Sequence, residues 1–160
     1  AHFRIEKRAI VGGNINKDLE HNQFIRTTRK YKNFELRLKY KVKASDESYN
    51  GGIQFRSVPC TIPGRSFEMV GYQADIISWK QGALYDEQRR WDFLGMPTGE
   101  GSRIRIWLNG VKTTDYIEPY IDEPFEGIGT INQEGHIALQ IHEGKACEVW
   151  YKDIEIEEIK

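Results

Sequence analysis

The sequence lacks any apolar run that approaches the roughly 20 residues a membrane-spanning helix requires, which excludes a helical membrane span. Its first residues, 1–6, do not show the basic-then-apolar pattern of a signal peptide. If the protein is exported, we therefore expect this chain to be the mature form or a fragment. Two cysteines, Cys60 and Cys147, allow at most one internal disulfide and cannot build a closed zinc site alone.

Neither sign of charge dominates. The chain carries 23 Lys and Arg against 24 Asp and Glu, for a formal net charge of −1. Binders of nucleic acid or of anionic membranes present strongly basic surfaces, so this balance argues against both partners. Repeats, low-complexity tracts and linkers are also missing, and 160 residues suffice for a hydrophobic core. We predict a single domain over residues 1–160.

The dominant positive signal is alternation of apolar and polar residues. Over residues 33–43, every second side chain is apolar and the intervening ones are charged, which predicts a strand with one buried face. The dipeptide Asn109-Gly110 lies between two such runs and predicts a tight hairpin. Further strands are expected at 52–56, 71–77, 103–108, 111–114, 136–142 and 147–156.

Amphipathic helices are not evident, and residues 66–69 would form one helical turn at most. About eight strands separated by Gly, Asn and Pro predict an all-β sandwich or jelly roll. The intervals expected to be loops, where functional residues concentrate, are 45–50, 59–66, 78–94 and 118–135.

Eight segments, taken in order, resemble the bacterial 3-keto-disaccharide hydrolase family over about residues 11–159. These segments are 24–27, 31–36, 50–56, 71–76, 82–87 with Arg89-Arg90, 107–110, 137–142 and 151–154. The resemblance implies a concanavalin- or laminarinase-like jelly-roll sandwich of two curved antiparallel sheets, with the ligand on the concave side. It also implies a sugar or glycoside ligand oxidised at C3 and an extracytoplasmic location, either periplasmic or secreted.

Two features depart from the family pattern. Relatives begin with a Gly-Trp-bearing strand that this sequence lacks, and residues 95–101 replace a strand that carries a Trp-Asn pair. These departures favour an alternative to catalysis, namely a non-catalytic carbohydrate-binding or structural module of a larger extracellular assembly. A homo-oligomer is a further expectation.

Strand parity selects the candidate site residues. Ile53 and Phe55 share one face, so Gln54 and Arg56 point the opposite way. The same parity groups Gln73 with Asp75 and Gln140 with His142. If these polar faces line one sheet, the side chains converge, and the loop that carries Tyr85 and Asp86 joins them to form a sugar-sized site. The alternative is that they form the ordinary solvent-facing side of antiparallel strands.

The catalytic candidates are His142, Asp75, Arg56 and Tyr85. A ketone at C3 acidifies the C2 hydrogen, and His142 is the expected base because histidine titrates near neutral pH. Arg56 or a divalent metal would stabilise the enolate, and Tyr85 or Asp86 would protonate the leaving oxygen, with the base and acid interchangeable. Asp75 and His142 are also the candidate metal ligands. Alternatively, His142 ends its strand and binds sugar hydroxyls.

The substrate-binding candidates combine amides, charges and one indole: Gln54, Gln73, Gln140, Asp86, Glu87, Arg89 and Trp107. The acidic and basic members near residue 87 would otherwise form a salt-bridged surface turn. For Trp107, as for Trp79 and Trp91, stacking on a sugar and packing against protein both remain open. A two-carboxylate glycosidase mechanism is not expected, because the acidic alternation at 153–157 is typical of a charged edge strand.

Overall fold

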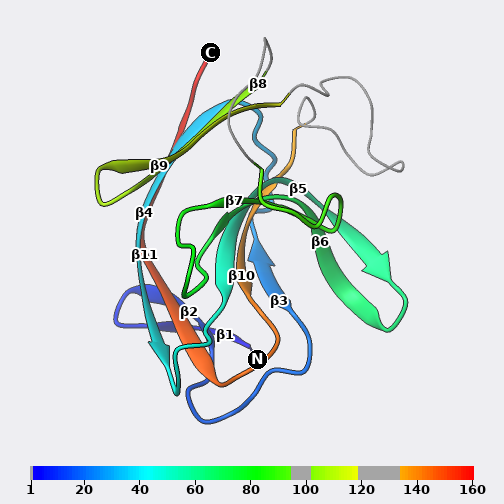
Figure 1. Ribbon diagram of the computed structural model, residues 1–160, viewed down its shortest axis with the longest axis vertical. Coiled ribbons are helices and arrows are strands. Elements are labelled where there is room, and N and C mark those ends of the chain that lie inside the picture. The colour runs from blue at the N-terminus through cyan, green and yellow to red at the C-terminus, as the bar shows by residue number, and fades with distance from the viewer. Residues whose placement is uncertain (1, 95–101, 119–133) are drawn as a thin grey trace.

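The computed structural model describes residues 2–94, 102–118 and 134–160. Within these ranges the chain forms eleven strands and no helix (Figure 1). The strands are β1 Phe3–Glu6, β2 Ala9–Gly13, β3 Gln23–Arg26, β4 Phe34–Ala44, β5 Gly51–Ile62, β6 Arg65–Asp75, β7 Leu84–Glu87, β8 Ser102–Leu108, β9 Val111–Glu118, β10 His136–Ile141 and β11 Cys147–Glu158. No helix long and apolar enough to cross a membrane is present in these three ranges.

Antiparallel pairing organises the strands into three sheets. A four-stranded sheet has the order β1-β2-β11-β4, a five-stranded sheet has the order β3-β10-β5-β6-β7, and β8 pairs with β9 alone. Strands distant in sequence are neighbours in both larger sheets, because the chain passes back and forth between the two sheets of the sandwich. The predicted all-β sandwich of antiparallel sheets is confirmed.

The main core lies between the two larger sheets. Ile53, Leu139 and Ile141 of the five-stranded sheet pack with Val149 and Tyr151 of the four-stranded sheet. Tyr151 is fully buried, and its hydroxyl lies 2.9 Å from the Gln140 carbonyl oxygen and 3.2 Å from that of Gly52. A polar link therefore crosses the apolar core and ties β11 to the two strands opposite.

Two local predictions are confirmed in detail. The apolar residues of β4 are partly buried and pack against the core, whereas the charged residues between them are exposed. In the hairpin that joins β8 to β9, Asn109 has a φ of 51° and Gly110 a φ of 80°. Positive φ at both central residues is the signature of the type I′ turn expected from Asn-Gly.

Other local expectations were wrong. Residues 59–66 are not a loop, because β5 runs to Ile62 and β6 starts at Arg65. Residues 66–69, for which one helical turn at most was expected, belong to β6. The expected loop 78–94 contains β7. Residues 95–101 and most of the expected loop 118–135 lie outside the described residues.

The distal half of the β5–β6 hairpin folds back toward its own sheet. Gln54 pairs with Gln73, and Met69 lies four residues further along β6, about 13 Å away on a straight strand. Yet the Gln54 side-chain nitrogen lies 3.5 Å from the Met69 carbonyl oxygen. The ladder is irregular between Phe55 and Val58, and this bulge allows the hairpin to bend. The bend of the hairpin is visible at the right of Figure 1.

We expect Tyr151→Phe to lower the free energy of unfolding by about 1–2 kcal/mol, because two buried carbonyl groups then lose a hydroxyl donor. Urea unfolding followed by fluorescence measures this change. Tyr40→Phe is the matched control, since the Tyr40 hydroxyl donates one bond in a partly buried position and its loss should cost less. Equal stability of Tyr151→Phe and the unmodified chain would show that the cross-sheet link contributes nothing.

Candidate functional site

Polar side chains gather on the face of the five-stranded sheet that points away from the core. We call the side chains of Gln54, Gln73, Asp75, Glu87 and Gln140 the polar face. They come from four adjacent strands, β10, β5, β6 and β7, and all are at most 5% exposed. Register brings them together, because Gln54 lies opposite Gln73, and Gly52 lies opposite both Gln140 and Asp75.

A glycine at position 52 makes room within the polar face. A Cβ atom there would lie 2.4 Å from the Gln73 side-chain carbon Cδ, so the glutamine occupies the space that any other residue would fill. Lying across Gly52, the Gln73 amide donates a 2.7 Å hydrogen bond to the Asp75 carboxylate. This bond fixes the orientation of Asp75.

Two carboxyl groups of the polar face hold their protons unusually tightly. Burial raises the pKa of Asp75 to about 6, although the hydrogen bond from Gln73 opposes the rise. Burial also raises the pKa of Glu87 to about 7, and the negative charges of Asp75 and Glu68 add to the effect. The charge on Asp75 thus contributes to the raised pKa of Glu87, and both carboxyl groups have pKa values near neutral pH.

Glu68 adds a third carboxylate from the folded hairpin. It is 2% exposed and lies 3.5 Å from the side-chain nitrogens of both Asn22 and Gln88. Arg65 forms a 3.4 Å ion pair with Glu68 and a 2.8 Å ion pair with Glu143, which follows β10. These ion pairs fasten the hairpin over the sheet.

The glutamine amides of the polar face are incompletely paired. In the described part of the chain, the side-chain oxygens of Gln54, Gln73 and Gln140 are buried without a hydrogen-bond donor. Unpaired buried acceptors are costly and uncommon in folded proteins. Three of them beside two carboxyl groups form a surface suited to hydroxyl donors.

Tyr85 borders the polar face from β7, directly opposite Gln73. Burial raises the pKa of its hydroxyl, and the negative charges of Glu87 and Asp75 raise it further. The phenol therefore stays protonated at neutral pH and can donate a hydrogen bond next to the carboxyl pair.

His142 lies at the end of the sheet where Asp75 lies. It is the residue after β10, and its backbone nitrogen bonds to the Asn50 carbonyl, which precedes β5. Its ring nitrogen Nδ1 is 2.6 Å from the Glu143 carbonyl oxygen, so Nδ1 carries a proton and the neutral ring offers Nε2 as the acceptor. The position is half-buried, and its role as a base stays a prediction.

The structure places Arg56 away from the carboxyl pair. Arg56 sits in the β5 bulge with a φ of 49°, and its guanidinium donates to the Lys32 carbonyl and the Asn33 side chain at 2.8 and 2.9 Å. The bulge interrupts the regular alternation of faces that begins at Ile53, so alternation does not predict which way Arg56 points. Arg56 therefore supports the turn before β4, and its contacts provide no support for an enolate-stabilising role.

Asp86 and Arg89 belong to a different cluster. Asp86 points to the core side of β7, is fully buried, and forms ion pairs with Arg89 at 2.5 Å and Arg90 at 2.8 Å. Arg90 also pairs with Glu118, which accepts a 2.6 Å hydrogen bond from Tyr72. This buried network attaches β9 to β7, so the residues form neither a surface turn nor part of the polar face.

The predicted stacking residue Trp107 lies on the β8–β9 ribbon and is 53% exposed. It contributes nothing to the polar face in the described structure. Across the residues described, no group of three His, Cys, Asp or Glu side chains is arranged to hold a metal ion. Cys60 and Cys147 are both free thiols.

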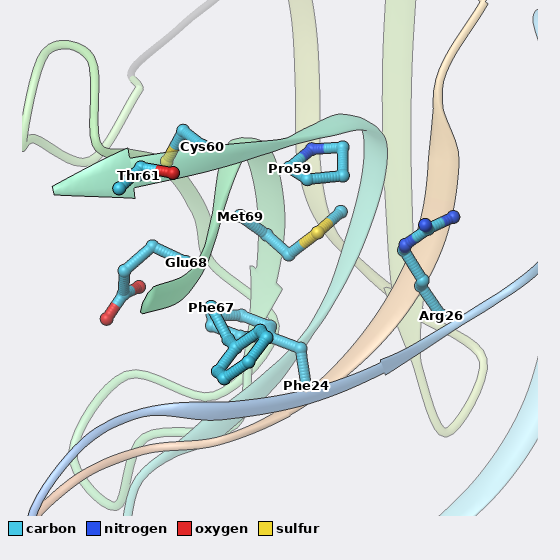
Figure 2. A pocket seen from close by; sticks show the side chains of 8 residues that line it. All are labelled: Phe24, Arg26, Pro59, Cys60, Thr61, Phe67, Glu68 and Met69. Atoms are coloured by element: carbon cyan, nitrogen blue, oxygen red, sulfur yellow. The ribbon is translucent and has the colours of Figure 1, made fainter. Parts of the chain in front are cut away.

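A cavity of about 330 Å³ opens between β3 and the folded hairpin. Figure 2 shows the eight side chains that line it: Phe24, Arg26, Pro59, Cys60, Thr61, Phe67, Glu68 and Met69. Glu68 belongs both to this lining and to the group of carboxylates that faces Glu87. The cavity therefore approaches the polar face from the β3 side.

Sequence reasoning missed Glu68, Asn22 and Gln88. Glu68 differs in parity from Gln73 and Asp75, and only the bend in β6 turns it toward Glu87. Asn22 and Gln88 lie just outside β3 and β7, where alternation carries no information. No signal in the sequence marks these three residues as partners.

We expect the chain to lose stability as pH rises from about 4 to 7. Asp75 and Glu87 have folded-state pKa values above their unfolded ones, so their contribution is complete at low pH and vanishes above pH 7. Each shift corresponds to roughly 3 kcal/mol. Urea unfolding at pH 5 and pH 8 should show a smaller difference for Asp75→Asn than for the unmodified chain. Parallel pH dependence in the two proteins would contradict the raised pKa.

Comparison with known proteins agrees with this architecture. Residues 2–157 match the model of a family described as 3-keto-alpha-glucoside-1,2-lyase-like domains. A crystal structure from Parabacteroides distasonis ATCC 8503, described as a candidate glycosyl hydrolase, shares the fold with a TM-score of 0.57. It is 22% identical, and the match covers 98% of this chain and 90% of that one. No curated protein matches. The chain belongs to the 3-keto-alpha-glucoside-1,2-lyase-like domain family.

Proposed function

We propose that this protein cleaves 3-keto-glycosides by elimination followed by hydration, with Asp75 and Glu87 as the acid–base pair. The observation that carries the proposal is the presence of two buried carboxyl groups on the same face of the sheet, with pKa values of about 6 and 7. Groups that titrate near neutral pH are efficient proton acceptors and donors under ordinary conditions. Two carboxyl groups with separated pKa values can divide the two roles.

The chemistry requires one proton to leave carbon and another to reach oxygen. The ketone at C3 acidifies the hydrogen on C2, and the Asp75 carboxylate removes that proton to leave an enolate. The enolate electrons then form the C1–C2 double bond as the C1–O bond breaks, and protonated Glu87 gives its proton to the leaving oxygen. Addition of water across the double bond completes a net hydrolysis.

Neighbouring groups support each step. The Tyr85 hydroxyl stays protonated and borders the pair, so it is our candidate to donate a hydrogen bond to the enolate oxygen. The oxygens of Gln54, Gln73 and Gln140 would accept bonds from sugar hydroxyls. Tyr85 thus takes the role that the sequence assigned to Arg56.

His142 is the alternative base. Its neutral ring would use Nε2, because Nδ1 faces the Glu143 carbonyl. It lies at the same end of the sheet as Asp75, so both residues could approach one face of a bound sugar. Separate substitutions distinguish the two assignments.

Access is the main requirement of the proposal. Asp75 is 5% exposed and Glu87 is 4% exposed, so a sugar reaches them only when covering side chains move. The folded β5–β6 hairpin contributes Glu68 to this cover and is held by Arg65. Opening of the hairpin would admit the substrate, and closure would exclude water from the reaction.

The same burial favours a second candidate function, a non-catalytic carbohydrate-binding or structural module. In that case the carboxyl pair and glutamines are a closed polar interior. Binding would use another surface, and the protein would release nothing from an oxidised glycoside.

The test uses 4-nitrophenyl 3-keto-glucoside and its unoxidised parent. We expect release of nitrophenol from the oxidised compound alone. Asp75→Asn should lower kcat at least 100-fold, because the base is lost with little change in shape. Glu87→Gln should have a smaller effect with nitrophenolate, a good leaving group, than with an alkyl leaving group. The exposed Glu47→Gln is the matched control.

The pH profile of kcat/KM distinguishes the assignments further. A bell with limbs near pH 6 and 7, whose acid limb disappears in Asp75→Asn, supports the carboxyl pair. Full activity of Asp75→Asn with loss of activity in His142→Gln would assign the base to His142 instead. Glycan binding without any release would favour the non-catalytic module.

A further inference from the structure

Aromatic side chains continue the polar face beyond the edge of the sheet. Tyr85 pairs with Phe93 in an isolated antiparallel bridge, so the cross-strand row Gln54, Gln73 and Tyr85 extends to Phe93 on the same face. The Tyr85 and Phe93 rings lie 5.1 Å apart between centroids, and Trp79 packs edge-on against Phe93 at 5.5 Å. We call Tyr85, Phe93 and Trp79 the aromatic strip.

Side-chain exposure increases from the polar face to the far end of the aromatic strip. Gln73 is 1% exposed, Tyr85 and Phe93 are half-buried, and Trp79 is 68% exposed. One end of the strip therefore borders the carboxyl pair and the other end meets solvent. A ligand that extends from the polar face over the β7 edge would lie along it.

The loop that presents Trp79 is firmly held. The Gln81 side chain donates a 2.6 Å hydrogen bond to Tyr49 and accepts a 2.7 Å bond from Tyr40, both outside the five-stranded sheet. The carbonyl of Gly82 accepts bonds from the hydroxyls of Thr113 and Thr114 at 2.7 and 3.1 Å. An exposed indole on an anchored loop is preorganised for a ring-shaped ligand, because little entropy is lost on contact.

We propose that the aromatic strip binds the ring on the leaving side of the scissile bond, a second pyranose whose apolar C–H face stacks on Trp79. This inference rests on the proposed function. The leaving side is assigned to β7 because Glu87, the proposed acid, lies on that strand together with Tyr85. The cavity that contains Phe24 and Phe67 lies at β3, the opposite edge of the sheet.

The experiment compares a 3-keto-disaccharide with methyl 3-keto-glucoside, which has no second ring. For Trp79→Ala we expect the ratio of their kcat/KM values to fall about tenfold, the loss of one aromatic contact. Trp79→Phe should restore most of the ratio. Thermal unfolding checks folding, which the substitution should preserve because the indole is largely exposed.

Trp91→Ala is the matched comparison, since Trp91 is 58% exposed and forms no ring contact with the strip among the described residues. Its ratio should match that of the unmodified chain. An unchanged ratio in Trp79→Ala, or equal losses in both variants, would overturn the assignment of the strip.

Failure of the proposed function gives a different result. If the unmodified chain cleaves neither compound, catalysis fails, and calorimetric titration with the 3-keto-disaccharide then tests the strip by itself. Binding that weakens about tenfold in Trp79→Ala supports the subsite. Binding that is absent, or equal in both proteins, rejects it.

Discussion

Closure of the β5–β6 hairpin over the polar face is the constraint on which the proposed chemistry depends. An exposed carboxyl group titrates near pH 4, far below neutrality. Burial raises the pKa of Asp75 to about 6. Burial, together with the negative charges of Asp75 and Glu68, raises the pKa of Glu87 to about 7. Arg65 compensates part of this negative charge at Glu68 and also fastens the hairpin to Glu143. The contacts that hold the hairpin in place therefore also influence the pKa of Glu87.

The bend that permits closure arises from local backbone features. Arg56 adopts a positive φ in the bulge, and Gly71, on the neighbouring strand, lies against Ser57 so closely that a Cβ atom would be 2.3 Å from the serine hydroxyl. Without the bulge, β6 would run straight and Glu68 would lie far from Glu87. A few residues in the middle of two long strands thus decide which carboxylates interact, although none of them belongs to the polar face.

Alternation in the sequence was sufficient to predict the faces of regular strands. It grouped Gln54 with Arg56, Gln73 with Asp75 and Gln140 with His142 within each strand, and the register of the sheet places Gln54, Gln73, Asp75 and Gln140 on one face. It failed where strands are irregular, as at the bulge of Arg56, and where a strand is four residues long, as in β7, which was expected to be a loop. Alternation could not predict the burial of the polar face, because the distal half of the β5–β6 hairpin folds over side chains that alternation alone would assign to solvent.

Burial raises the pKa values of the two carboxyl groups but also closes them off from solvent. Under the proposed mechanism, the hairpin must therefore first open to admit a glycoside and then close again. The hairpin is suited to such a cycle because its cover rests on amide contacts near 3.5 Å and on the partly exposed ion pairs of Arg65, which are weak compared with core packing. The β7 side differs, since buried ion pairs fix Asp86 to Arg89 and the bonds of Gln81 and Gly82 hold the loop of Trp79. A movable cover over a rigid aromatic edge would let a glycoside dock by its outer ring before the hairpin closes on the oxidised one.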